Sequence, residues 1–210
     1  MNSGYYVGNG TSQSITGLGF QPDLVIIKSE VANYGVGTTA QMHDPESTAY
    51  FTQNSDNFDN GVEVASGGFS VGSNGNVNNA GTVYCWTAFG NSGSADFKIG
   101  TYTGNGQAAE RYVTGLGFQP DCVVIKREGT SRAVWHTSAM AVDTVSYFSS
   151  TADDATGQIK SFDTDGFKIG TANAGVNDYA DTYFYFAFKQ ESDKFKVGTY
   201  TGDGADDPPA

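Results

Sequence analysis

Residues Thr16–Lys28 read TGLGFQPDLVIIK, and residues Thr114–Lys126 read TGLGFQPDCVVIK. The second stretch begins 98 residues after the first, which is nearly half of the 210-residue chain. A period of this length is typical of a duplicated domain, whereas solenoid units repeat every ~20 to 50 residues. In both stretches a Phe-Gln-Pro corner precedes a short apolar run rich in β-branched residues, which is typical of a buried strand. The sequence therefore predicts two related β domains.

Aromatic runs and turn signals extend this prediction to the rest of the chain. Thr82–Phe89 (TVYCWTAF) matches Thr182–Phe188 (TYFYFAF), and both runs suit strands that pack on two faces in the middle of a sandwich. The 28 glycines, many in Asn-Gly or Asp-Gly pairs, indicate tight turns between short strands. We predict an all-β fold of two tandem antiparallel β-sandwiches, jelly-roll-like, at residues 1–94 and 95–194, with an extra C-terminal strand and tail at 195–210.

One phrase occurs more often than two domains require. Phe97–Gly106 reads FKIGTYTGNG, Phe195–Gly204 reads FKVGTYTGDG, and Gly4–Gly10 is a shortened version, GYYVGNG. The phrase is either the last strand of each domain or the first strand of the next one. The last copy, with Phe195, Val197 and Tyr200 as its apolar residues, either closes the second domain or is donated as a strand to the sheet edge of a neighbouring molecule. Both alternatives stay open at this point.

Charge and leader signals limit the possible partners. Eleven basic against 23 acidic residues give a net charge of −12, which repels the phosphates of nucleic acid and of anionic membranes. The N-terminus lacks a basic region and an apolar leader, and no stretch has the ~18 apolar residues of a membrane span. We expect a soluble chain made in the cytoplasm, without nucleic acid or membrane as partner. Cys85 and Cys122 occupy different places in the repeat, so we expect no disulfide framework.

Few residues carry the pattern of a catalytic or metal site. Asp163 and Asp165 alternate as in a calcium loop, but no glutamate completes the loop, so a turn with solvated acids is the preferred interpretation. His43 and His136 occupy different places in the repeat, which gives no shared base for a nucleophile and no zinc pattern. We expect no enzymatic activity, no cofactor and no metal, with Asp163 and Asp165 kept as candidate metal ligands.

A second candidate site is present in the second half only. Trp135, with Arg132 and His136 as neighbours, has Gly37 as its counterpart in the first half. An aromatic ring between planar polar groups is typical of a sugar-stacking or protein-docking patch. The alternative interpretation is that Trp135 fills a gap in the core.

The repeated phrases also carry a resemblance. YTGNG, GLGFQPD before an apolar strand and lysine, SFDTDGFKIG, and the aromatic closing run together resemble uncharacterised sandwich modules of tailed-phage virion structural proteins, which are similar to concanavalin or laminin-G jelly rolls. The first half departs from the pattern, because Val64–Gly72 reads VASGGFSVG and lacks the acidic pair. No catalytic residue is carried over.

The resemblance implies a binding or structural role on a bacteriophage particle. We expect a virion protein, made in the host cytoplasm and placed on the particle exterior, with capsid decoration as its role. The alternative is a tail-fibre or tail-appendage module for host adhesion. Capsid or tail proteins, a host surface glycan and further copies of the chain are the partners that the resemblance implies.

Overall fold

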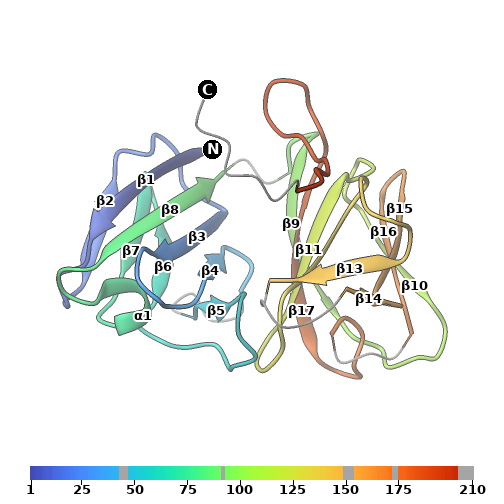
Figure 1. Cartoon of the computed structure of the whole chain (residues 1–210), viewed down its shortest axis with the longest axis horizontal. Coiled ribbons are helices and arrows are strands. Elements are labelled where there is room, and N and C mark those ends of the chain that lie inside the picture. Colours follow the sequence, from blue (N-terminus) through green and yellow to red (C-terminus); the bar gives the residue numbers. More distant parts are fainter. Residues whose placement is uncertain (43–46, 91–92, 149–153, 172–174, 203–210) are drawn as a thin grey trace.

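The computed structural model describes residues 1–42, 47–90, 93–148, 154–171 and 175–202. These residues form antiparallel β-sheets and one short helix (Figure 1). The predicted all-β class is confirmed. Within the described residues, no helix is long and apolar enough to cross a membrane.

The first half of the chain forms a five-stranded sheet in the order β1-β8-β3-β4-β5 and a three-stranded sheet in the order β2-β7-β6. We call this pair of sheets the first sandwich. Its elements are β1 (Asn2–Val7), β2 (Gln13–Thr16), β3 (Leu24–Ser29), β4 (Val36–Thr39), β5 (Ala49–Tyr50), β6 (Val62–Ala65), β7 (Gly68–Val71), α1 (Gly75–Asn78) and β8 (Val83–Phe89).

The second half forms a six-stranded sheet in the order β14-β13-β12-β11-β17-β9 and a three-stranded sheet in the order β10-β16-β15. This pair is the second sandwich. Its elements are β9 (Phe97–Thr103), β10 (Arg111–Thr114), β11 (Cys122–Arg127), β12 (Val134–Thr137), β13 (Thr144–Tyr147), β14 (Ala155–Thr156), β15 (Ile159–Asp163), β16 (Gly166–Ile169) and β17 (Thr182–Phe188). Strands β10, β11, β12 and β16 begin 98 residues after β2, β3, β4 and β7, respectively. The duplication itself and the predicted domain limits stay predictions.

Each sandwich has its own core between its large and its small sheet. Alternation along β3 turns Val25 and Ile27 inward, where neither is exposed, and along β7 it turns Phe69 inward. Tyr6 and Tyr84 stack across β1 and β8 with ring centroids 5.2 Å apart. In the second sandwich Tyr102 and Tyr183 stack in the same way, at 5.1 Å. The two cores are therefore built from the same strand faces.

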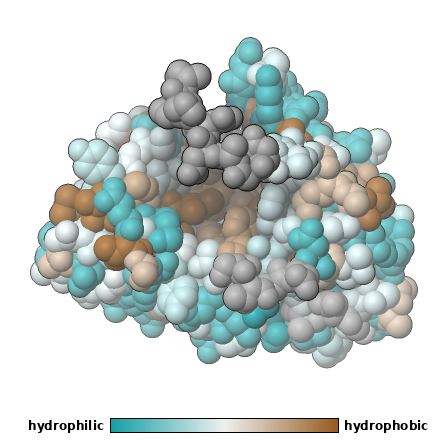
Figure 2. All heavy atoms as spheres, in the orientation of Figure 1, coloured by the Kyte–Doolittle hydropathy of each residue, from teal (hydrophilic) through white to brown (hydrophobic). Residues whose placement is uncertain are grey.

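A third apolar layer lies between the two large sheets. Leu24 and Phe51 from the first sandwich pack against Phe97, Val124 and Phe186 of the second. Both faces of β11 are consequently buried, which explains its unbroken apolar sequence. Figure 2 shows apolar surface in the hollow between the two halves, and further apolar patches on the outer sides of both halves among hydrophilic surface.

The pairing of β9 shows whether the segment Phe97–Gly106 ends the first domain or begins the second. Phe97–Thr103 pairs with β17 over seven residues, from Phe97 opposite Phe188 to Thr103 opposite Thr182. The interpretation that Phe97–Gly106 closes the first domain is wrong, because this segment is the first strand of the second sandwich. Residues 91–92 of the connection before it, and 203–210 of the predicted tail, lie outside the described residues.

Candidate functional site

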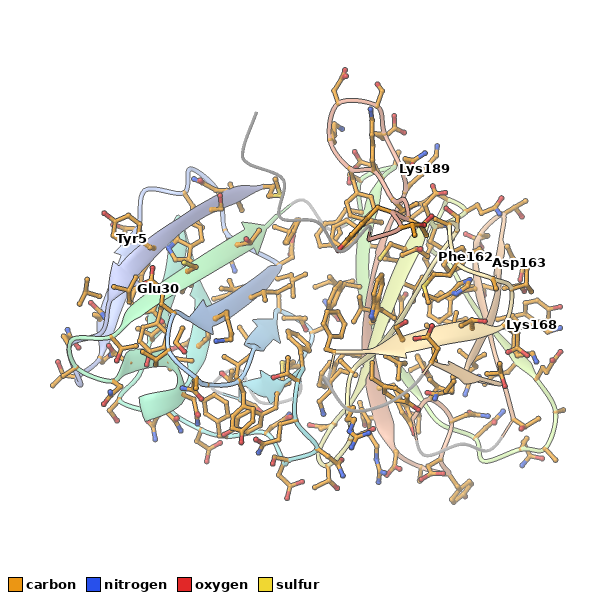
Figure 3. The ribbon with its side chains drawn as sticks, in the orientation of Figure 1. Tyr5, Glu30, Phe162, Asp163, Lys168 and Lys189 are labelled. Carbon is orange, nitrogen blue, oxygen red and sulfur yellow. The ribbon has the colours of Figure 1, made fainter. Side chains whose placement is uncertain are left out.

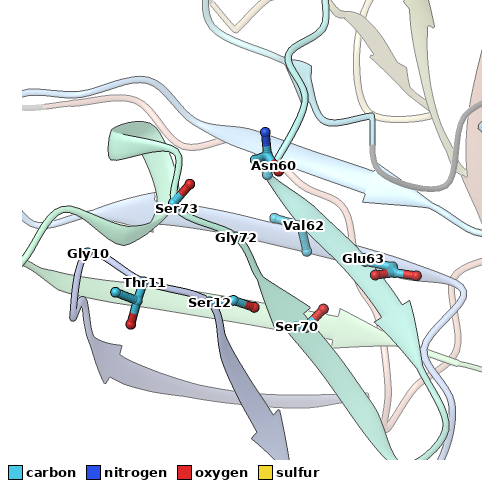
Figure 4. A pocket seen from close by; sticks show the side chains of 10 residues that line it. Gly10, Thr11, Ser12, Asn60, Val62, Glu63, Ser70, Gly72 and Ser73 are labelled. Atoms are coloured by element: carbon cyan, nitrogen blue, oxygen red, sulfur yellow. The ribbon is translucent and has the colours of Figure 1, made fainter.

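A polar groove of about 350 Å³ lies on the outer face of the small sheet of the first sandwich (Figure 4). The side chains that line it bear hydroxyl, amide and carboxylate groups, which are the groups that bind polar ligands. These side chains belong to Thr11, Ser12, Asn60, Glu63, Ser70 and Ser73.

Strand alternation explains why polar groups meet there. Phe69 and Val71 of β7 point into the core, so Ser70 between them points outward. Ser70 lies directly opposite Glu63 on β6. Gly72 lets the loop after β7 approach closely, because a Cβ there would lie 2.3 Å from the Asn60 carbonyl oxygen. The floor of the groove is thus formed by strands and its rim by loops.

The equivalent face of the second sandwich carries charged side chains. Lys168 stands where Ser70 stands, forms an ion pair with Glu110, and has its Nζ 5.4 Å from the centre of the Tyr112 ring. The hydrogen bond from Lys168 lowers the pKa of the Glu110 carboxyl. Lys160 Nζ is 2.6 Å from Asp143 Oδ2 on the same side. The groove therefore belongs to the first sandwich and is not a shared feature of the two halves.

The structure separates the three residues of the predicted aromatic patch. Trp135 and His136 are consecutive on β12, so their side chains point to opposite faces of the sheet. Trp135 packs in the layer between the sandwiches, with its ring 6.0 Å from that of Phe148. His136 is 4 % exposed, its Nδ1 lies 2.5 Å from the Thr144 carbonyl oxygen, and burial lowers its pKa.

The Arg132 guanidinium lies over the Tyr147 ring, 5.8 Å from its centre. The prediction that Arg132, Trp135 and His136 form one surface patch is wrong, because strand alternation places Trp135 and His136 on different faces. Trp135 instead fills space in an apolar layer.

Of the acidic pair, Asp165 has a structural role. Asp165 accepts hydrogen bonds from the backbone amides of Gly115 and Gly117, at 3.0 and 2.7 Å. Asp163 ends β15 opposite Gly166, at the rim of the second sandwich (Figure 3). Among the described residues, no group of three or more His, Cys, Asp or Glu side chains is placed to hold a metal ion. His43, one of the two histidines considered from the sequence, lies outside the described residues.

The candidate donor strand begins beside the other copies of its phrase. The Phe195 ring stacks on that of Phe188, with centroids 4.9 Å apart, and the Val197 amide donates to Gln190 Oε1 at 3.0 Å. Phe195 and Met1 both line a second cavity of about 400 Å³. Tyr200 is 95 % exposed. In its described part, residues 195–202, the segment forms no ladder with either large sheet.

Sequence reasoning missed the polar groove. The sequence feature that could have indicated it is the difference between the two copies at Val64–Gly72. There VASGGFSVG has small and hydroxyl-bearing residues where the second copy has acidic and basic ones. The loop around Thr11, which completes the groove with Asn60, is distant in sequence from that strand.

A family model matches the chain over both sandwiches and the C-terminal segment. The matching family is described as "Domain of unknown function (DUF7483)", and the match spans residues 1–209. No curated protein matches the chain, and no solved structure matches it. Because the match spans nearly the whole chain, the protein belongs to the DUF7483 family.

Proposed function

We propose that this chain is a non-enzymatic structural protein on the exterior of a bacteriophage particle, with capsid decoration as its role. The resemblance of its repeated phrases to phage sandwich modules suggests the setting. Its net charge of −12 suits an exterior position, because an acidic surface is repelled by packaged nucleic acid.

The observation that carries the proposal is the apolar layer between the sandwiches. The layer contains side chains that are no more than 6 % exposed, among them Leu24, Phe51, Val124 and Phe186. A close-packed interior of this kind transmits force and permits little independent motion. A stiff block of two sandwiches is suited to cover and brace a particle surface, and less suited to a flexible enzyme.

The copy number in purified particles tests this role. We expect quantitative mass spectrometry to find the chain at a ratio to the major capsid protein that corresponds to many copies on each shell. Antibody labelling should mark the whole shell. A handful of copies confined to the tail contradicts decoration, and absence from particles contradicts the virion role altogether.

The polar groove supports a second candidate function, the binding of a carbohydrate on the host surface. Its volume of about 350 Å³ falls within the ~300–1,000 Å³ of small-molecule sites. Hydroxyl and carboxylate groups such as Ser70 and Glu63 match the donors and acceptors of sugar hydroxyls. This function assigns the chain to a tail fibre or tail appendage rather than to the shell.

Substitution at Ser70 tests the second candidate. Ser70→Lys places in the groove the residue that the second sandwich has there, so we expect it to abolish retention of the protein on host polysaccharide. Thr101→Lys, on an exposed position of β9, adds the same charge away from the groove and should leave retention unchanged. Equal retention of both variants and the parent protein contradicts a carbohydrate site in the groove.

A further inference from the structure

The C-terminal copy of the repeated phrase has the sequence of a docked strand without the contacts of one. Aligned with β1 and β9, its residues Gly198, Thr199 and Tyr200 correspond to Gly4, Tyr5 and Tyr6 and to Gly100, Thr101 and Tyr102. The contacts of the first two copies therefore show what this sequence requires of its surroundings.

The tyrosine is a buried anchor in both docked copies. Tyr102 is 8 % exposed, stacks on Tyr183, and donates its hydroxyl to the Val176 carbonyl oxygen at 2.7 Å. Tyr6 is 9 % exposed, stacks on Tyr84, and donates to the Val77 carbonyl oxygen. Tyr200 makes neither contact, because its side chain is 95 % exposed. The third copy thus has the anchoring tyrosine but lacks the stacked ring and the carbonyl acceptor that surround it in the other two copies.

The glycine before it gives an independent indication. A Cβ at Gly4 would lie 2.8 Å from the Trp86 ring, and a Cβ at Gly100 would lie 2.5 Å from the Tyr185 hydroxyl, so each copy needs glycine to pass an aromatic side chain. At Gly198 a Cβ would meet nothing within 4 Å. The same contrast separates Gly202 from the earlier glycines at the end of the phrase. Glycine here satisfies no requirement of the isolated chain.

The connection that leads into the segment indicates where it goes. After β8 the chain leaves the first sandwich, and Phe97 packs on Phe89 with ring centroids 5.8 Å apart before β9 joins the next sheet. After β17 the chain makes the same step, with Phe195 stacked on Phe188 at 4.9 Å. By this geometry the segment Phe195–Gly202, like β9 before it, leads from one sandwich toward the next. It does not return to the sheet that contains β17.

We propose that Phe195–Gly202 pairs with β8 of a second copy of this chain, in the place of that copy's β1. In the register of β1, Gly198 then lies opposite Trp86, Thr199 opposite Cys85 and Tyr200 opposite Tyr84. The contact is antiparallel strand addition, in which backbone hydrogen bonds supply affinity and the tyrosine socket supplies register.

The strand β1 is the weaker of the two occupants that β8 can take. It is an edge strand of its sheet, and Met1 is 76 % exposed while Ser3 is also exposed. The C-terminal copy brings Phe195 and Val197 to these two positions. In β9 the corresponding Phe97 and Ile99 are only 6 and 5 % exposed, so the larger residues bury apolar area that β1 does not.

An interface of this kind uses different surfaces on the two copies. Each chain offers its C-terminal segment to one neighbour and its β8 to another, so the contact is head-to-tail. Such contacts close into rings or extend into filaments. The proposal concerns association between copies and does not depend on where the protein is located.

A single cysteine substitution tests the register. Cys85 is a free, exposed thiol on β8, whereas Cys122 is buried. Residues directly opposite on antiparallel strands have Cα atoms about 4.5 to 5.5 Å apart, which is within the range of a disulfide. We expect the full-length Thr199→Cys variant to form covalent dimers and larger species on mild oxidation. Mass spectrometry should identify a peptide pair that joins Cys85 to position 199.

Three controls keep the test decisive. Lys196→Cys faces the other side of the strand, lies opposite Ala88 in the proposed register, and should give no more cross-link than the parent protein. Adding Cys85→Ser should abolish the Thr199→Cys product. Adding Gly198→Val, which meets nothing in the isolated chain but clashes with Trp86 in the complex, should lower the yield about tenfold at equal protein concentration.

Two results overturn the proposal. The first is a disulfide between Cys85 and position 199 within one chain, which shows as a cross-linked monomer and means that the segment replaces β1 in its own molecule. The second is a cross-link yield for Thr199→Cys equal to that of Lys196→Cys, which means that the segment does not dock on β8 in this register.

Discussion

Two lysines at the same place in the repeat have different surroundings. Lys28 ends the run DLVIIK and is exposed, whereas Lys126 ends DCVVIK and is 1 % exposed. The ammonium group of Lys126 donates to the carbonyl oxygens of Arg127 and Gly129, at 2.5 and 2.7 Å. Burial, with a smaller contribution from the Arg127 charge, lowers the pKa of Lys126 to about 8. The difference arises because the first sandwich covers the outer face of β11.

This pKa predicts how stability depends on pH. Between pH 8 and about 10.5 the unfolded chain binds a proton at Lys126 that the folded chain has released, so the free energy of unfolding rises with pH in that window and loses this contribution as pH falls to 8. The full effect is at most about 3 kcal/mol. The raised pKa of the buried Cys122 thiol acts in the opposite direction above about pH 9, so the comparison between variants isolates the lysine. From pH 7.5 to 10.5 we expect the free energy of unfolding, measured in urea, to increase more or decrease less in the parent protein than in Lys126→Met.

Lys28→Met is the matched control for this measurement. Because Lys28 is exposed, this variant should keep the pH profile of the parent protein. Parallel profiles for the parent and Lys126→Met would show that the lysine titrates at its ordinary pKa in the folded protein.

At the scale of elements, the β15–β16 hairpin and the loop before β11 are held together by one side chain. Both oxygens of Asp165 accept amide hydrogen bonds from that loop, at Gly115 and Gly117, where positive φ values of 89° and 82° turn the amides toward it. The first sandwich makes only the backbone bond, from the Leu18 amide to the Gly67 carbonyl oxygen. The acid therefore strengthens a contact that the fold already has.

Removal of this carboxylate should destabilise the protein without any link to calcium. Asp165→Ala loses two charge-assisted but exposed hydrogen bonds, so we expect a loss of about 1 kcal/mol in the free energy of unfolding. Thr164→Ala, at the neighbouring position of the same turn, should change stability by less. Thermal melts with calcium and with chelator should coincide for the parent protein. A calcium-dependent rise in melting temperature that Asp165→Ala removes would instead indicate a metal site.

For the whole molecule, the layer between the sandwiches determines whether they unfold as one unit. Phe51 is 5 % exposed, its ring lies 5.9 Å from that of Phe186, and its carbonyl oxygen accepts the Ala133 amide at 3.3 Å. One residue of the first sandwich thus contacts the second through both its side chain and its backbone.

Truncation of Phe51 should uncouple the two sandwiches. Phe51→Ala removes a buried ring at a cost of about 3 kcal/mol or more, and we expect calorimetry to resolve two transitions where the parent protein shows one. Phe148→Ala is the matched control, because Phe148 packs in the same region but is 41 % exposed. A single, merely lowered transition for Phe51→Ala would show that the halves remain coupled without this ring.

The sequence by itself determined the fold class and the positions of the main strands. The runs at Leu24–Ser29 and Cys122–Arg127 are short, apolar and bounded by prolines and turns, and these local properties specify a buried strand wherever the chain places it. The acidic turn at Asp165 was also interpreted correctly as a turn, because Asp-Gly after a strand restricts the backbone locally.

Only the tertiary structure decided which surfaces meet. The sequence did not show that Phe97–Thr103 pairs forward with β17, that Trp135 and His136 lie on opposite faces, or that Lys126 is buried while Lys28 is exposed. The polar groove likewise depends on loops from distant parts of the chain. Local patterns fix the conformation of a strand, but its partner and its burial depend on contacts between residues far apart in the sequence, and these exist only after the sandwiches have packed.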